Sequence, residues 1–136
     1  MTTISYQCEQ VSADEFASVL GRSGLAARRP AGDAARLQRM LDNANLIVTA
    51  RAESDRQLVG IARSLTDFSY ATYLSELAVD ARFKGRGIGK RLIEETRRHA
   101  GEECMLLLVS APDAVSFYDS IGAPKSDRAY LYPRSC

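Results

Sequence analysis

The sequence predicts a single domain, residues 1–136, of the α/β (α+β) class, in which a mixed β-sheet is combined with helices. Its length, with 46% hydrophobic and 26% charged residues, is typical of one globular domain. Two short apolar runs separated by a polar stretch predict an antiparallel hairpin. A later strand–helix–strand order predicts a parallel pair of strands, so the sheet is mixed.

Charge and cysteine usage limit the classes of partner. Eighteen Lys and Arg against seventeen Asp and Glu give a net charge of +1, so no global field attracts nucleic acid or an anionic membrane. No apolar stretch approaches the roughly 20 residues that span a bilayer. Three cysteines without a C-x-x-C pair, and a first segment unlike a signal peptide, predict a reduced, cytoplasmic location. No metal site is predicted.

The first half of the chain predicts two helices between strands. A short strand at Ile4–Gln7 precedes a helix capped by Ser12 and ended by Gly21, and 22–32 is expected to be a loop. A second helix is expected to begin at Asp33. The hairpin strands that follow are expected at Leu46–Ala50 and Leu58–Ala62.

The second half predicts the parallel pair. A long strand at about Tyr70–Val79 leads to a helix at Ile88–Ala100, and the uninterrupted apolar run Cys104–Val109 predicts a strand buried on both faces.

The end of the chain predicts one more helix and one more strand. Ser110–Asp113 has a capping-box pattern that predicts the start of a helix, which Gly122 ends. The chain is expected to close with a short strand at Ala129–Tyr132.

Three glycines alternate at the turn between the long strand and its helix: Gly85, Gly87 and Gly89. Without side chains they let backbone N–H groups approach a ligand, and the helix start adds partial positive charge. Four cations surround the turn, namely Lys84, Arg86, Lys90 and Arg91. The segment therefore predicts a cradle for a phosphate or pyrophosphate.

Two common phosphate motifs do not fit this segment. A Walker A loop would need a glycine where Lys84 stands and Ser or Thr where Arg91 stands. The dinucleotide pattern Gly-x-Gly-x-x-Gly would need its third glycine where Lys90 or Leu92 stands.

The acyl-CoA loop pattern Gln/Arg-x-x-Gly-x-Gly/Ala does fit, and here the sequence resembles the GNAT superfamily of N-acetyltransferases. Leu77–Leu92 is similar to the family's strand, loop and helix, and Ala114–Gly122 is similar to its Ala-x-x-Phe-Tyr-x-x-x-Gly helix. The resemblance covers about residues 46–122. It implies a mixed central sheet flanked by helices on both faces, with acetyl-CoA as co-substrate and an amine as acceptor.

The chain departs from the family pattern at three positions. Lys84 stands where Gln or Arg is usual, although Arg82 begins a second, overlapping match. Ala111 replaces a frequent Asn, and Ala123 replaces the Phe that usually follows the glycine at position 122.

The resemblance also implies roles for particular residues. The long strand is expected to be bulged and to separate from its neighbour, so that N–H groups of Leu77, Ala78 and Val79 bind the pantetheine and the thioester oxygen. The pyrophosphate is expected in the cradle, formed by Lys84, Gly85, Arg86, Gly87, Ile88, Gly89 and Lys90.

Two side chains are candidates for proton transfer. Tyr118 matches the family's general acid, since a phenol of pKa about 10 is protonated at neutral pH and can donate to a leaving thiolate. Alternatively it is a core tyrosine. Glu76 is the nearest carboxylate candidate for a general base, or else an edge or solvent-facing residue.

Five arginines lie in and after the first interhelical loop, which in the family borders the acceptor site: Arg22, Arg28, Arg29, Arg36 and Arg39. They either recognise an acidic group of the substrate or form a solvated face.

Together these features predict an acetyl-CoA-dependent N-acetyltransferase that acts on a primary amine of a small molecule or peptide by direct transfer, and a homodimer is allowed. The alternatives are a noncatalytic acyl-CoA-binding or regulatory domain, and a nucleic-acid module that uses the Arg- and Gly-rich segment. The balanced charge and the position of that segment at a strand–helix junction disfavour the last.

Overall fold

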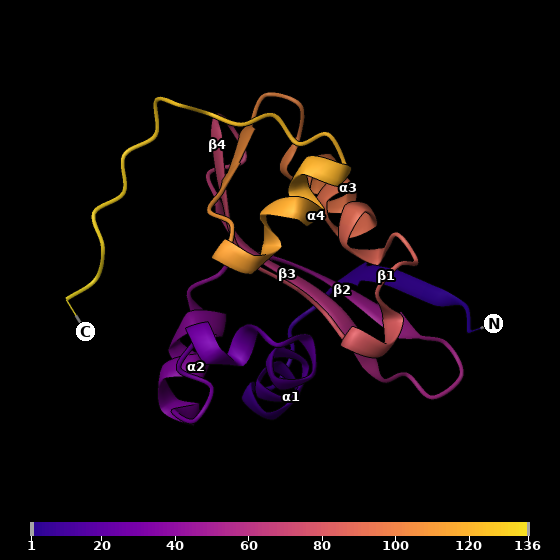
Figure 1. The fold of residues 1–136 in the computed structure, drawn as a ribbon. Coiled ribbons are helices and arrows are strands. Elements are labelled where there is room, and N and C mark those ends of the chain that lie inside the picture. The colour runs from indigo at the N-terminus through magenta and orange to yellow at the C-terminus, as the bar shows by residue number, and fades with distance from the viewer. Residues whose placement is uncertain (1, 136) are drawn as a thin grey trace.

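Five strands form one mixed sheet in this computed structural model, which describes residues 2–135 (Figure 1). They lie side by side in chain order: β1 Ile4–Cys8, β2 Leu46–Ala52, β3 Leu58–Thr66, β4 Ala71–Val79 and β5 Met105–Leu108. Pairs from β1 to β4 are antiparallel, and β4 and β5 are parallel. The predicted hairpin and the predicted parallel pair are both confirmed.

Helices cover both faces of the sheet, as expected (Figure 1). The helices are α1 Ala13–Ser23, α2 Ala34–Asp42, α3 Ile88–Ala100 and α4 Val115–Ser120, with short 3₁₀ turns at Leu25–Arg28, Ala81–Phe83 and Pro112–Ala114. One core lies between α1, α2 and the sheet and includes Phe16, Leu20, Leu37, Leu41 and Ile61. The other lies under α3 and includes Val48, Val59, Leu74, Ile88 and Leu92.

The α1 helix begins where the sequence predicts but ends later. The Ser12 hydroxyl accepts a hydrogen bond from the Glu15 N–H at 3.1 Å, which caps the helix. The prediction that Gly21 ends it is wrong, because Gly24 takes the left-handed conformation (φ 89°) and closes the helix three residues later. The segment 22–32, predicted as a loop, therefore contains the end of α1 and the turn Leu25–Arg28.

The β5 strand is an edge strand, so the prediction that it is buried on both faces is wrong. Met105 and Leu107 are 55% and 39% exposed. The reason is that α1 and α2 pack on the part of this face formed by Ile47, Ile61 and Ala78, which leaves the face of β5 uncovered.

The C-terminal segment differs from prediction at both ends. The Ser110 hydroxyl donates to the Ala111 carbonyl and does not cap α4, which instead follows the turn Pro112–Ala114. Gly122 (φ 72°) ends the helix as predicted. The strand predicted at Ala129–Tyr132 is absent, because these residues pair with no strand among residues 2–135 and extend away from the sheet as the yellow trace of Figure 1.

Close packing of α3 on β3 depends on Gly60. A Cβ atom at this position would lie 3.1 Å from Leu92 Cδ1, 3.2 Å from Ile88 Cγ2 and 3.4 Å from Ala50 Cβ. Because Ile88 is the first residue of α3, Gly60 also fixes how near the start of that helix comes to the sheet.

Gly60→Ala is expected to destabilise the protein by roughly 1–3 kcal/mol, because the added methyl group overpacks the contact between α3 and β3. The matched control is Gly21→Ala in α1, where nothing lies within 4 Å and alanine should stabilise the helix by up to about 1 kcal/mol. Urea unfolding measures both. An unchanged midpoint for Gly60→Ala would show that close packing here does not constrain the fold.

Candidate active site

A gap opens in the sheet between β4 and β5. The two strands pair only between Ala71–Leu74 and Met105–Leu108, whereas β4 continues to Val79 paired with β3 but without a partner on its other side. On the other side of β4, Arg63 faces Glu76 and Ser64 faces Leu74, so Ser75 is an extra residue that forms a bulge. The bulge and the separation implied by the resemblance are therefore confirmed.

Backbone donors of β4 face this gap. The Asp80 N–H donates to the Val59 carbonyl of β3 at 2.8 Å. Because peptide groups alternate sides along an antiparallel ladder, the N–H of Ala78 also faces β3, whereas those of Leu77 and Val79 face the gap. Of the three predicted binding residues, Leu77 and Val79 thus have N–H groups directed toward a ligand in the gap.

The predicted cradle, residues 84–90, forms at the start of α3. Gly85 and Gly87 have φ angles of 83° and 77°, a conformation that favours glycine. Gly87 is the cap residue of α3, and no side chain accepts hydrogen bonds from the first turn. The first-turn N–H groups are therefore available to an anion.

The four cations predicted around the turn are exposed, and three of them make contacts within the chain. Arg91 lies 4.6 Å from the centre of the Tyr6 ring and pairs with Glu95 at 3.4 Å. Lys84 Nζ donates to the Ser23 carbonyl at 3.3 Å, and the Arg86 guanidinium lies 4.9 Å from the centre of the Phe83 ring. Lys90 is exposed on the first turn of α3. All four lie on or beside the glycine turn, as predicted.

A buried carboxylate anchors the strand that leads into the cradle. Asp80 accepts hydrogen bonds from the Arg22 side chain at 2.8 Å and from the Arg82 N–H at 2.9 Å. Hydrogen bonds from Arg82, with help from Arg22, lower the pKa of Asp80 to about 2. Arg22 also donates to the Leu58 carbonyl at 2.7 Å, so the end of β4 is fixed to both α1 and β3.

Tyr118 on α4 lines a cavity of about 820 Å³ that continues the gap between β4 and β5. Burial raises the pKa of Tyr118, and the Arg29 charge lowers it by a smaller amount, so the phenol stays protonated at neutral pH. The neighbouring Phe117 ring packs on Gly89, where a Cβ atom would lie only 2.8 Å from Phe117 Cζ. Gly89 therefore lets α4 pack closely on the first turn of α3.

Glu76 lies on the wall of the same cavity and is only 1% exposed. Arg63 Nε donates to one carboxylate oxygen, and Arg29 Nε and the Ser75 hydroxyl donate to the other at 2.7 and 2.8 Å. Burial alone would raise the pKa of Glu76, but the hydrogen bonds and charge of these partners, Arg63 above all, hold it below its usual range. Glu76 is therefore charged at neutral pH.

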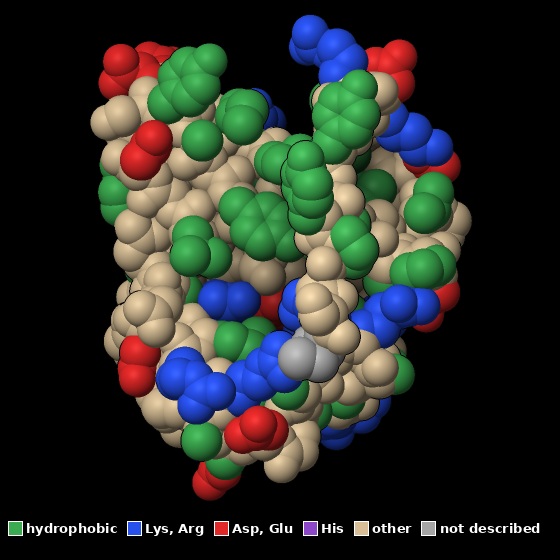
Figure 2. Space-filling view, turned by 90° about the vertical axis from the view of Figure 1, so that its left-hand side faces the viewer, with side chains coloured by type: hydrophobic (Ala, Val, Ile, Leu, Met, Phe, Trp, Pro, Cys, Tyr) green, Lys and Arg blue, Asp and Glu red, His purple; other side chains and the backbone are tan. Residues whose placement is uncertain are grey.

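Among residues 2–135, five arginines line this cavity, against one acidic residue, Glu76. They are Arg28, Arg29, Arg36, Arg63 and Arg134. Figure 2 shows Lys and Arg side chains gathered around a hollow in the lower half of this face, whereas hydrophobic side chains dominate its upper half. Arg22 and Arg39 were predicted to lie near the acceptor site with Arg28, Arg29 and Arg36, but they do not line the cavity.

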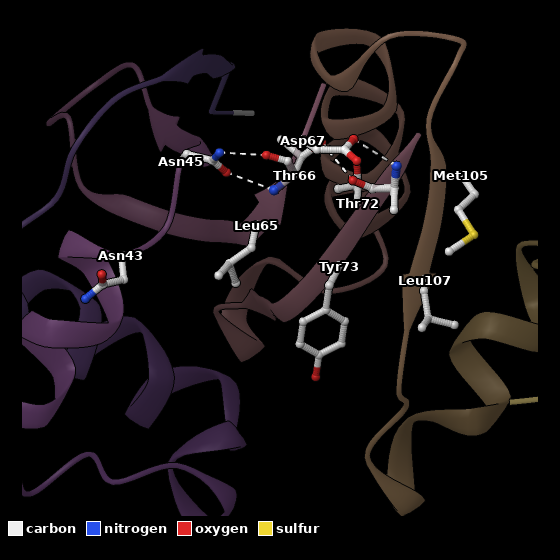
Figure 3. Close-up of a pocket in the computed structure, with 10 residues that line it drawn as sticks. Asn43, Asn45, Leu65, Thr66, Asp67, Thr72, Tyr73, Met105 and Leu107 are labelled. Atoms are coloured by element: carbon white, nitrogen blue, oxygen red, sulfur yellow. Dashed lines mark hydrogen bonds between the residues drawn. The ribbon is translucent and has the colours of Figure 1, made fainter. Parts of the chain in front are cut away.

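A second, more open hollow of about 550 Å³ lies beside the first, on the uncovered part of the sheet. Figure 3 shows Leu65, Tyr73 and Leu107 pointing to the same side of the sheet. The amide of Asn45 is satisfied within the chain, since it donates to the Thr66 carbonyl and accepts from the Thr66 N–H. This hollow thus presents mainly apolar side chains.

Sequence reasoning missed the partners of Glu76. Arg63 occupies the buried interior of a strand, and a charged residue within an apolar run needs a partner. That pattern could have signalled an ion pair, although not with which carboxylate.

Among residues 2–135, no cluster of three or more His, Cys, Asp or Glu side chains is arranged to hold a metal ion. No helix in this range combines the length and the hydropathy needed to cross a bilayer.

Comparison with known proteins places the chain in a family. Residues 16–128 match the model of the acetyltransferase (GNAT) domain. Among curated proteins, the chain is 29% identical over 104 residues to the uncharacterized N-acetyltransferase ycf52 of Pyropia yezoensis, a match that covers 69% of this chain and 59% of that protein. The chain thus spans about three fifths of the length of this relative.

Solved structures share the fold. A Deinococcus radiodurans protein assigned as an acetyltransferase is 26% identical, with a TM-score of 0.72 over 97% of this chain and 93% of that one. An aminoglycoside N-acetyltransferase, solved in complex with CoA, is 17% identical, with a TM-score of 0.71 over 100% and 97% of the two chains. With the domain match, these findings show that the chain belongs to the GNAT acetyltransferase family.

Proposed function

We propose that residues 1–136 form an acetyl-CoA-dependent N-acetyltransferase that transfers an acetyl group directly to a primary amine of a small molecule or peptide. One observation carries the proposal: Tyr118 and the unpaired edge of β4 line one cavity, and α4 packs on the first turn of α3, where the cradle lies. Family membership and the CoA complex of a structural neighbour support it.

The chain offers separate groups for each part of acetyl-CoA. The pyrophosphate would lie at residues 84–90, where the first-turn N–H groups of α3 and the side chains of Lys84, Arg86 and Lys90 supply positive charge. The N–H groups of Leu77 and Val79 would bind the pantetheine and the thioester oxygen. Donors held rigidly in a strand stabilise the charge that develops on that oxygen.

The proposed reaction needs one proton acceptor and one proton donor. The neutral amine attacks the thioester carbon, a C–N bond forms and the C–S bond breaks. The nitrogen loses a proton, which Glu76 would accept directly or through water. The Tyr118 hydroxyl gives a proton to the leaving sulfur, so the products are the amide and CoA with a free thiol.

Two further expectations stay predictions. The homodimer would have the exposed apolar side chains of β5 available for contact, and its mass in solution is measurable by light scattering. The cytoplasmic location also stays a prediction.

Acetyl-CoA is expected to raise the melting temperature of the protein. Ligand at about 100 times its dissociation constant adds roughly 2.7 kcal/mol of stability if only the folded state binds. Gly87→Glu should abolish the shift, because a carboxylate would fill the cradle and repel phosphate. Gly101→Glu is the control, since it places the same residue at another positive φ, at the opposite end of α3, and should keep the shift. No shift of the wild type at millimolar acetyl-CoA would refute the proposed binding.

Glu76→Gln is expected to lower kcat/KM at neutral pH, with partial recovery at high pH where the neutral amine is abundant. Because the substitution also breaks a buried ion pair, at a cost of about 3–5 kcal/mol, folding must be checked by urea unfolding. Arg63→Met is the matched control, since it breaks the same pair from the other side and keeps the carboxylate. If Glu76→Gln shows the pH profile of the wild type, Glu76 has a structural role only.

Tyr118→Phe is expected to lower kcat by about 10²- to 10⁴-fold with little change in acetyl-CoA affinity, because it removes a proton donor and keeps the ring. Tyr70→Phe removes a hydroxyl from an exposed tyrosine outside the cavity and should be neutral. The measurement is steady-state release of CoA under conditions where chemistry limits the rate. A Tyr118→Phe enzyme that keeps more than about a third of wild-type kcat would make Tyr118 a packing residue.

A further inference from the structure

The arginines that line the cavity carry more positive charge than its single carboxylate, Glu76, can neutralise. Arg29 and Arg63 both bind Glu76, so this cluster alone keeps a net positive charge. Their remaining donors bind within the chain: Arg29 to the Ser75 carbonyl at 2.7 Å, and Arg63 to the Met40 carbonyl at 2.9 Å. These two arginines are therefore held as part of the cavity wall.

Three other arginines also line the cavity. Within residues 2–135, the side chains of Arg28, Arg36 and Arg134 make no hydrogen bond or ion pair, and apart from Glu76 no acidic residue lines the cavity. Arg28 ends the turn after α1, and Arg36 lies in the first turns of α2. The turn after α1 and the start of α2 thus each contribute an arginine to the cavity lining.

The turn that carries Arg28 is anchored. Its neighbour Arg29 donates to Glu76 and to the Ser75 carbonyl of β4, and Arg29 also donates to the Arg28 carbonyl at 2.9 Å. The backbone of Arg28 is therefore held in place beside the cavity, and its guanidinium fork matches the planar oxygens of a carboxylate or phosphate. This favours recognition of an anion over a merely solvated face.

We infer that the amine acceptor carries a negatively charged group, a carboxylate or a phosphate, which binds Arg28 and Arg36 while the amine lies near Tyr118. The inference rests on the proposed function and narrows it to a substrate class. Polyamines and other polycationic acceptors are disfavoured, because a second positive charge would be repelled by the arginines that line the cavity.

Four amines of similar length test the substrate class: 4-aminobutanoate, 3-aminopropyl phosphate, butylamine and 1,4-diaminobutane. CoA release gives kcat/KM for each, with an enzyme-only control for the cysteine thiols of the protein. We expect the better anionic amine to exceed butylamine by at least about tenfold, diaminobutane to be the poorest, and the advantage to shrink at high salt. The two anionic amines decide between carboxylate and phosphate.

Arginine substitutions test where the negatively charged group of the acceptor binds. Arg28→Gln with Arg36→Gln should raise KM for the preferred anionic amine by about tenfold or more and remove most of its advantage over butylamine. Arg39→Gln is the matched control, because Arg39 is an exposed arginine of the same helix α2 that does not line the cavity. An equal loss in Arg39→Gln, or no loss in the double variant, would overturn the assignment of these two residues.

A binding measurement keeps the inference separate from the proposed function. Calorimetry with the same four amines, in the presence of CoA, reports acceptor affinity without turnover. Tighter binding of the anionic amines supports the inference even if none is acetylated, in which case the proposed enzyme activity fails instead. Acetylation or binding of butylamine or diaminobutane at least as good as that of both anionic amines overturns the inference and leaves the acetyltransferase proposal standing.

Discussion

The buried carboxylate of Glu76 is the interaction on which the site depends. It joins Arg63 on β3 to Arg29 on the loop between α1 and α2, at the place where Ser75 makes β4 bulge. A buried charge is tolerated only when paired and hydrogen-bonded, and here both oxygens are occupied. The same contact therefore fixes the bulge that precedes the gap in the sheet and the loop that borders the cavity.

A second constraint connects the cradle to the candidate acid. Gly89 lies in the first turn of α3, and the Phe117 ring packs directly on its backbone. Tyr118, the residue after Phe117, lines the cavity. On its other side, α3 packs on Gly60 of β3. Two glycines thus set the distances from α3 to the sheet and to α4, so that residues far apart in the sequence share one rigid frame.

The elements best predicted from sequence are those with complete local signals. The bounds of α3 were predicted correctly, because the glycine turn marks its start and an apolar stripe continues to Ala100. The wrong or missing predictions concern which parts of the chain contact each other in space. An apolar run indicates a strand but not whether anything covers it, so the exposure of β5 and the unpaired segment 129–132 were missed. The ion pairs of Glu76 join residues 13 and 47 positions apart, beyond any local pattern.

The charge of the cavity bears on the protonation state of the amine acceptor in the proposed reaction. Because Glu76 is shared between two guanidinium groups, it does not neutralise the remaining arginines. Cations close to a bound amine disfavour its ammonium form and so lower its pKa. An amine that binds partly neutral needs less help from a base, which compensates for the low basicity of a carboxylate whose pKa lies below its usual range. The anionic group inferred for the acceptor would then provide the attraction that the amine itself cannot.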